Sequence, residues 1–121
     1  MSESETIVRR LLLAATLGGD NQIERVEVHH IDLAPSQQAG LHSHPCPVIG
    51  AVLKGEILLQ VEGHKEMLLG PGNGFYEPAG TPIARFDNTS GLETASFIAC
   101  YLLPPGESRL ITMLGHLDLR S

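Results

Sequence analysis

The residues GLHSHPCPVIGAVLKG, at positions 40–55, contain two histidines separated by a single residue. In an extended backbone, residues two apart project to the same face and lie about 6.6 Å apart along the chain. The side chains of His42 and His44 therefore point the same way, and their imidazoles can converge on one metal ion at roughly 2.1 Å. The spacing predicts a metal-ligand pair on the inner face of a β-structure. The alternative is a pair of polar residues at the edge of a loop.

Glycine and proline divide the rest of the chain at short intervals, which favours strands over long helices. Thirteen glycines and eight prolines leave apolar segments of about five to eight residues, the spacing of an all-β barrel or sandwich. Alternation over residues 25–33 predicts a strand with Val26 and Val28 on one face and Ile31 and Leu33 on the other. Further strands are expected over residues 48–53, 56–61, 65–69, 75–77, 83–86 and 94–103.

The first apolar segment, residues 7–17, fits either one side of a short helix or a strand ending at Gly18-Gly19. We favour a strand that pairs with a second copy across a two-fold axis, because such pairing would cover an otherwise exposed edge. A homodimer is therefore expected. The 121 residues are predicted to form one domain, 1–121, with an N-terminal strand or arm over 1–24, a barrel over 25–103 and a C-terminal segment over 104–121.

Composition and charge exclude several classes of function. The net charge of −6 arises from 14 acidic and 8 basic residues, and the only adjacent bases are Arg9 and Arg10, so a nucleic-acid partner is not expected. Cys46 and Cys100 are too few and too far apart for a disulfide framework. Residues 1–6 lack the basic and apolar parts of a secretory signal, and no apolar run approaches the roughly 20 residues of a membrane helix. We expect a cytoplasmic protein with no membrane partner.

A second stretch, GNGFYEPAGTPIARFDN at positions 72–88, completes a pattern when it is taken with the first. Together the two stretches resemble the two-motif signature of the cupin superfamily, and the chain is similar to its small single-domain members of the cupin-2 type. The resemblance implies an all-β fold, the RmlC-like double-stranded β-helix or jelly-roll barrel. The matching residues are Gly40, His42, His44 and Gly55 in the first motif, and Gly72, Pro78, Gly80 and either Asp87 or Asn88 in the second.

The sequence departs from the family pattern at two of the usual ligand positions. Val48 stands where the family has a glutamate, and Ile83 stands where it has a third histidine. Glu77 resembles a substituted ligand, because its carboxylate would complete a two-histidine, one-carboxylate set with positions open for substrate or oxygen. The ordinary alternative is a glutamate at the barrel rim. With His42, His44 and Glu77 as ligands, the resemblance implies a divalent cofactor, one of Fe, Mn, Ni or Zn.

Apolar residues near these ligands are expected to shape a dry substrate pocket. Val48 and Ile83 would line it, and Cys46, two residues after His44, is nominally on the same face. A small buried thiol that takes no part in the site is the alternative for Cys46.

The remaining histidines are expected to take no part in the site. Of the neighbours His29 and His30, only one can face the interior of a strand, while His64 in a turn and His116 near the C-terminus are expected to be exposed. The run Asn88-Thr89-Ser90 predicts a turn in which side chains bond their own backbone.

Three hypotheses about function follow from these residues. The first is a metal-dependent protein acting on a small molecule, for which the resemblance implies an oxygenase, isomerase or decarboxylase. The second is a metal-free barrel that binds a small ligand as a sensor or carrier, because Val48 and Ile83 make the cavity apolar. The third is an interaction module whose dimer is the functional object.

Overall fold

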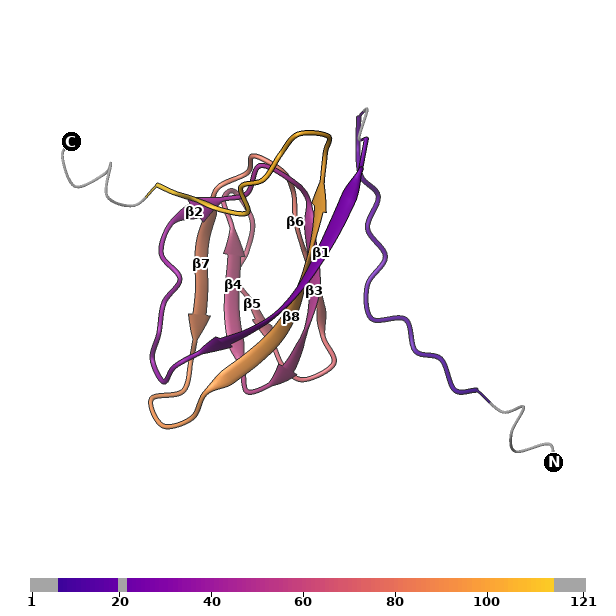
Figure 1. The fold of residues 1–121 in the computed structure, drawn as a ribbon. Coiled ribbons are helices and arrows are strands. Elements are labelled where there is room, and N and C mark those ends of the chain that lie inside the picture. The colour runs from indigo at the N-terminus through magenta and orange to yellow at the C-terminus, as the bar shows by residue number, and fades with distance from the viewer. Residues whose placement is uncertain (1–6, 20–21, 115–121) are drawn as a thin grey trace.

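Two antiparallel sheets facing one another make up the body of the chain in the computed structural model, which describes residues 7–19 and 22–114 (Figure 1). The first sheet has four strands in the order β1 (Arg25–Leu33), β8 (Ala95–Leu103), β3 (Val48–Lys54) and β6 (Gly74–Glu77). The second has five in the order β5 (Met67–Leu69), β4 (Ile57–Val61), β7 (Ile83–Asn88), β2 (His42–Ser43) and β9 (Thr112–Met113). The all-β barrel predicted from the sequence is confirmed. No helix suited to crossing a bilayer occurs in the part of the chain that the structure describes.

Alternation along β1 sets the inside and the outside of the four-stranded sheet. Val28 is 63% exposed, whereas Leu33 is 6% exposed. β1 pairs with β8 along its whole length, from Arg25 opposite Leu103 to Leu33 opposite Ala95, so both strands share this alternation. The faces predicted for β1 are therefore confirmed.

The three phenylalanines of the chain meet in the space between the sheets. Phe75, Phe86 and Phe97 come from β6, β7 and β8, and their ring centroids lie 4.8–5.9 Å apart. Tilted and edge-to-face contacts of this kind add about 0.5–1.5 kcal/mol per pair beyond the burial of area. Because Phe86 belongs to the five-stranded sheet and the other two belong to the four-stranded sheet, this cluster ties the sheets together.

The amide side chain of Asn88 joins three backbone segments at the end of β7. Its Nδ2 donates to the carbonyls of Leu33, Ala34 and Glu93 at 2.7–3.2 Å, and its Oδ1 accepts a hydrogen bond from the Ser90 backbone at 2.9 Å. The predicted turn is thus confirmed. Of the two residues that could match the family asparagine, Asn88 is the buried one.

Residues 7–17 form no strand within the single chain, so the strand expected there is absent from this structure. They run as an extended arm beside the edge strand β6, where Leu12 and Leu13 lie close to the Gly74 backbone (Figure 1). The arm has no strand partner along the chain, and strand geometry without a ladder of hydrogen bonds gains little stability. Pairing across a two-fold axis stays a prediction.

Of the C-terminal segment, residues 104–114 join the barrel, which therefore extends past the boundary expected at residue 103. After β8 the chain crosses one end of the barrel and returns as β9, which pairs with β2 so that Met113 stands opposite His42 (Figure 1). The Leu114 amide also donates to the Leu41 carbonyl at 2.9 Å. This crossing segment, residues 104–111, is here called the strap.

Gly50 allows the closest approach inside the four-stranded sheet. It faces the interior between Val48 and Val52, and a Cβ added there would overlap the Ile98 carbonyl oxygen and lie 2.5 Å from Cζ of Phe75. Neither the backbone carbonyl nor the phenylalanine cluster can move away without loss of packing.

We predict that Gly50→Ala destabilises the fold by roughly 1–3 kcal/mol through overpacking. Urea denaturation gives the change in the free energy of unfolding. Gly70→Ala is the matched control, since its added Cβ would meet nothing closer than 3.9 Å. Equal losses in both variants would contradict the packing argument.

Candidate metal centre

The structure brings His42, His44 and Glu77 together inside the barrel. One ligand atom from each lies within 4.8 Å of the others, and each residue is at most 4% exposed. His42 is in β2 of one sheet, His44 follows directly after β2, and Glu77 ends β6 of the other sheet. The three side chains therefore meet across the interior, and Glu77 is not at the rim.

Each imidazole is oriented by a backbone carbonyl on the side away from the cluster. His42 Nδ1 lies 2.6 Å from the Gly40 oxygen, and His44 Nδ1 lies 2.7 Å from the Leu110 oxygen. A carbonyl only accepts hydrogen bonds, so Nδ1 carries the proton in both rings. In the neutral imidazoles, Nε2 then presents a lone pair, which is the form that binds a metal.

Glu77 occupies the position directly opposite Val48 in the pairing of β6 with β3. Residues opposite one another in an antiparallel ladder point to the same face. The carboxylate that the family pattern expects at Val48 is therefore supplied by the paired strand, into the same interior space. Both side chains are buried, at 3% and 1% exposure.

The contact between His44 and Glu77 leaves two polar atoms without partners. His44 Nε2 lies 2.8 Å from Glu77 Oε1, but in the neutral ring that nitrogen has no hydrogen to donate. Among the described residues, His44 Nε2 and Glu77 Oε2 are buried without a hydrogen-bond partner. Two facing lone pairs in an apolar interior are costly, and either a proton or a metal cation between them removes the cost.

The two histidines respond differently to this environment. Burial lowers the pKa of His42, although the Gly40 carbonyl and the Glu77 charge act the other way. For His44, burial again acts to lower the pKa, but the Glu77 carboxylate and the Leu110 carbonyl outweigh it and raise the pKa above its ordinary value. The net pKa shift is thus upward for His44 and downward for His42.

A cavity of about 130 Å³ opens beside the cluster and is lined mostly by apolar side chains. Of the predicted pocket residues, Val48 lines it. Ile83 and Cys46 are fully buried but are not among the described lining residues. Ile83 packs directly opposite His42 in the β2–β7 ladder. Cys46 belongs to the buried hydrophobic core, and burial raises the pKa of its thiol. The lining residues are Ile31, Leu33, Ala39, His42, His44, Val48, Phe75, Glu77, Phe86, Phe97, Ala99, Tyr101 and Ile111.

Tyr101 is a cavity residue that the sequence pattern did not identify. It stands opposite Val48 in the β3–β8 ladder, and its ring meets the His44 ring edge-on at 5.8 Å between centroids. Burial raises its pKa to about 12, so the phenol stays protonated at neutral pH. The sequence showed only that Tyr101 alternates with outward-facing residues in a long apolar strand. This alternation alone does not distinguish a residue that lines a cavity from one that packs in the core.

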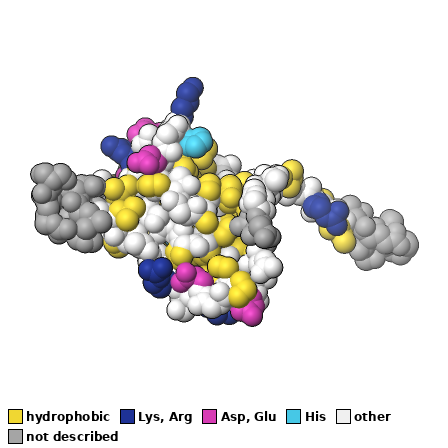
Figure 2. Space-filling model, turned by 90° about the horizontal axis from the view of Figure 1, so that it is seen from above, with side chains coloured by type: hydrophobic (Ala, Val, Ile, Leu, Met, Phe, Trp, Pro, Cys, Tyr) yellow, Lys and Arg dark blue, Asp and Glu magenta, His cyan; other side chains and the backbone are white. Residues whose placement is uncertain are grey.

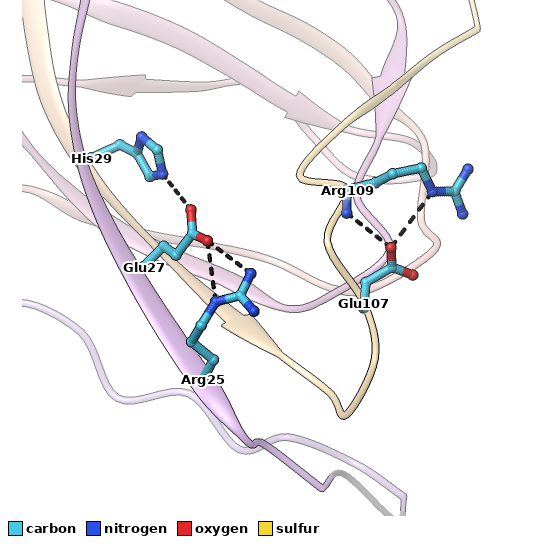
Figure 3. Close-up of polar contacts among 5 residues, drawn as sticks. All are labelled: Arg25, Glu27, His29, Glu107 and Arg109. Carbon is cyan, nitrogen blue, oxygen red and sulfur yellow. Dashed lines mark hydrogen bonds and ion pairs between the residues drawn. The ribbon is translucent and has the colours of Figure 1, made fainter.

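Figure 3 shows two groups of polar contacts outside the cluster, one on β1 and one on the strap. On β1, Glu27 accepts from His29 at 2.9 Å and from Arg25 at 2.8 Å, and these bonds lower its pKa. On the strap, Glu107 accepts from the Arg109 backbone at 2.9 Å, and the guanidinium lies 3.5 Å away. Both guanidinium groups are thus paired with carboxylates, and neither lines the cavity.

The remaining histidines lie away from the cluster. His29 faces the interior side of β1 and meets the Tyr101 ring at 5.2 Å, while His30 points outward. His64 is exposed in the turn after β4, and His116 lies outside the described residues. A wider hollow of about 550 Å³, lined in part by His64 and Tyr76, contains none of the three clustered residues.

We predict that Glu77→Gln lowers the pKa of His44 below its ordinary value in the metal-free protein. The substitution removes the negative charge that outweighs burial. Imidazole ¹⁵N shifts followed against pH measure the effect, and the His42 pKa should also move down, because the Glu77 charge acts to raise it. An unchanged His44 titration would contradict this account of the pair.

The same pKa shift has a consequence for stability. Because the pKa of folded His44 is raised, its contact with Glu77 stabilises the metal-free protein fully below the unfolded pKa of about 6.5, and this contribution is lost as pH rises through the folded pKa. The folded pKa of His42 is lowered, so the unfolded state takes up a proton more readily at this residue. His42 therefore lowers the stability of the folded protein as pH falls below the unfolded pKa of about 6.5.

Comparisons with known proteins agree with this architecture. The family model described as Cupin domain matches residues 29–99 of the chain. The protein TT1209 from Thermus thermophilus is 30% identical with a TM-score of 0.58, over 70% of this chain and 79% of that one. A comparison with curated protein sequences gave no match.

Two enzymes share the fold at lower identity. The DMSP lyase DddQ from Ruegeria pomeroyi DSS-3 has a TM-score of 0.62 at 20% identity, over 73% of this chain and 42% of its own. An oxalate oxidase in complex with the substrate analogue glycolate has a TM-score of 0.62 at 24% identity, over 74% of this chain and 46% of its own. This chain spans less than half the length of either enzyme. With the family match extending over more than half of its residues, the chain belongs to the cupin domain family.

Proposed function

We propose that His42, His44 and Glu77 bind a divalent metal ion and that the adjoining cavity holds a small molecule against it. The observation that carries this proposal is the pair of buried atoms without hydrogen-bond partners, His44 Nε2 and Glu77 Oε2. A cation at this place would satisfy both atoms at once. It would also explain why two histidines and a carboxylate are buried in an otherwise apolar interior.

The donor set fits a first-row metal. Two imidazoles and one carboxylate, with the remaining positions open, are the donors of the non-haem Fe(II) oxygenases, and Mn, Ni and Zn accept the same donors. When bound, such an ion supplies Lewis-acid chemistry or a place for oxygen. The chain itself orients the imidazoles through the Gly40 and Leu110 carbonyls and excludes water with the phenylalanine cluster.

Small-molecule chemistry is supported by the cavity and by the enzymes that share the fold. A lyase and an oxidase are among the similar structures, although this chain covers less than half of each. The reaction class is therefore proposed only as far as an oxygenase, isomerase or decarboxylase. A metal-free ligand-binding barrel is the second candidate, favoured by Val48 and Ile83 at the two family ligand positions.

Protein prepared without nickel affinity resin should contain divalent metal by elemental analysis. We expect His42→Ala, His44→Ala and Glu77→Gln each to weaken binding of added Mn²⁺ by roughly 100-fold or more, since changes to outer-shell partners alone cost about 10–100-fold. His64→Ala, in an exposed turn, is the matched control and should bind normally. Absence of metal from the native protein, with no binding of added ions, would defeat the metal proposal and leave the metal-free candidate.

The ladder pairing provides a rescue experiment. Because Val48 and Glu77 stand opposite one another, the exchange variant Val48→Glu with Glu77→Val returns the carboxylate to the family position and conserves the buried groups. We expect it to recover much of the Mn²⁺ affinity lost in Glu77→Val alone. No recovery would mean that the two positions do not serve the same site.

We also propose that the chain forms a homodimer through the outer face of its four-stranded sheet. One row crosses all four strands without a charged residue: Val28, Cys100, Ile49 and Tyr76. The arm, which projects from the body in Figure 2, exposes Ile7, Val8, Leu11 and Leu12 by 51–81%. In a two-fold dimer, each copy supplies one sheet face and one arm. Such pairing would therefore cover the outer sheet face and the apolar arm of both copies.

Sedimentation of full-length protein should show a dimer, and deletion of residues 1–17 or Val28→Glu should shift it toward monomer. Leu92→Glu is the control, because Leu92 is 90% exposed in a loop outside the sheets. A dimer that persists in both the deletion and the Val28 variant would contradict this interface.

A further inference from the structure

The cavity divides into one polar corner and an apolar remainder. Its polar groups are His42, His44, Glu77 and Tyr101, which lie beside one another. Every other described lining residue is aliphatic or is one of the three phenylalanines. A ligand that fills this space therefore meets polar atoms at one end only, and its other end must be apolar.

The charges around the cavity restrict the charge of the ligand. A divalent ion with two neutral imidazoles and the single carboxylate of Glu77 has a net charge of about +1. One negative charge on the ligand balances it, whereas a second would be buried without a partner, at a cost that favours exclusion of a dianion. No lysine or arginine is among the described lining residues, and Arg25 and Arg109 are already paired with Glu27 and Glu107.

The volume of the cavity restricts the size of the ligand. It measures about 130 Å³. An apolar protein cavity of about 150 Å³ holds one benzene molecule. The ligand is thus limited to roughly six to eight non-hydrogen atoms.

Tyr101 provides a donor at the polar corner. Its ring meets the His44 ring at 5.8 Å between centroids, and Tyr101 is one of the residues that line the cavity. A phenol beside the metal ligands can donate to a ligand oxygen, which needs an acceptor at the same end as the chelating group.

We infer that the ligand class of this site is a small monoanionic chelator with a short apolar body, such as a 2-hydroxy or 2-oxo monocarboxylate, oriented by the Tyr101 hydroxyl. This inference rests on the proposed metal site. The chelating oxygens face His42, His44 and Glu77, and the apolar body lies among the phenylalanines.

The test compares two probes of equal size on Mn²⁺-loaded protein whose metal content has been measured first. 2-Hydroxyisobutyrate is a monoanion with an apolar body, and malonate is a dianion with the same number of non-hydrogen atoms. Binding is followed by titration calorimetry and by water-proton relaxation of the bound Mn²⁺. The stronger charge of malonate favours it for a free divalent cation. We expect the protein to reverse that order and to bind 2-hydroxyisobutyrate at least roughly tenfold more tightly.

Two variants locate the cause of the preference. Ile111→Arg places a cation in the lining at a residue that is 45% exposed, and it should shift the preference toward malonate by at least roughly tenfold. Tyr101→Phe should weaken 2-hydroxyisobutyrate roughly tenfold with Mn²⁺ affinity unchanged. Tyr76→Phe, the other tyrosine of the chain, lies on the outer face and should have no effect.

The outcomes separate this inference from the metal proposal. Protein that takes up no Mn²⁺ overturns the proposed function, and the inference with it. Protein that binds Mn²⁺ but prefers malonate, or binds neither probe, overturns the inference alone. Equal probe affinities in wild type and Tyr101→Phe overturn the role of Tyr101.

Discussion

The site depends on one contact, the 2.8 Å approach of His44 Nε2 to Glu77 Oε1 between the two sheets. Both groups are nearly inaccessible to water, and the His44 ring is not free to turn, because its Nδ1 is held by the strap carbonyl of Leu110. Two electron-rich atoms are thus fixed face to face in an apolar space. A positive species would satisfy this arrangement, either a proton or the metal ion proposed above. The raised pKa of His44 and the proposed affinity for a cation therefore have the same origin.

Features of the fold that arise from neighbouring residues were predictable from the sequence. The alternation in β1, the glycine and proline turns and the common face of His42 and His44 all depend on residues close together in the chain. Glu77 was identified by resemblance, but its place in the cluster follows from a ladder that joins residues 29 positions apart, Glu77 and Val48. Such a register depends on the packing of whole sheets, and local pattern does not reveal it.

Other parts of the site arise from contacts between distant residues. Leu110 and Ile111 lie on the strap, which the sequence presents as a tail after Pro104-Pro105-Gly106. Tyr101 resembles any other interior residue of a long strand until the register with β3 places it opposite Val48. Ile83 was expected in the cavity because it occupies a family ligand position. Ile83 instead lies opposite His42 in the pairing of β2 with β7. Its aliphatic side chain is shorter than the imidazole of the family histidine and does not extend to the cavity. The arm could not be assigned from one chain, since its expected partner is a second copy.

The strap also determines when the centre can form during synthesis. His42, His44 and Glu77 all precede the strap in the chain, but the carbonyl that fixes the His44 ring belongs to Leu110, and β9 follows it. Until Leu110 is in place, the His44 ring lacks its orienting carbonyl, whereas His42 takes its own from Gly40, two residues earlier. A cation entering the proposed site would therefore meet the finished geometry only after Leu110 has taken its place and β9 has paired with β2.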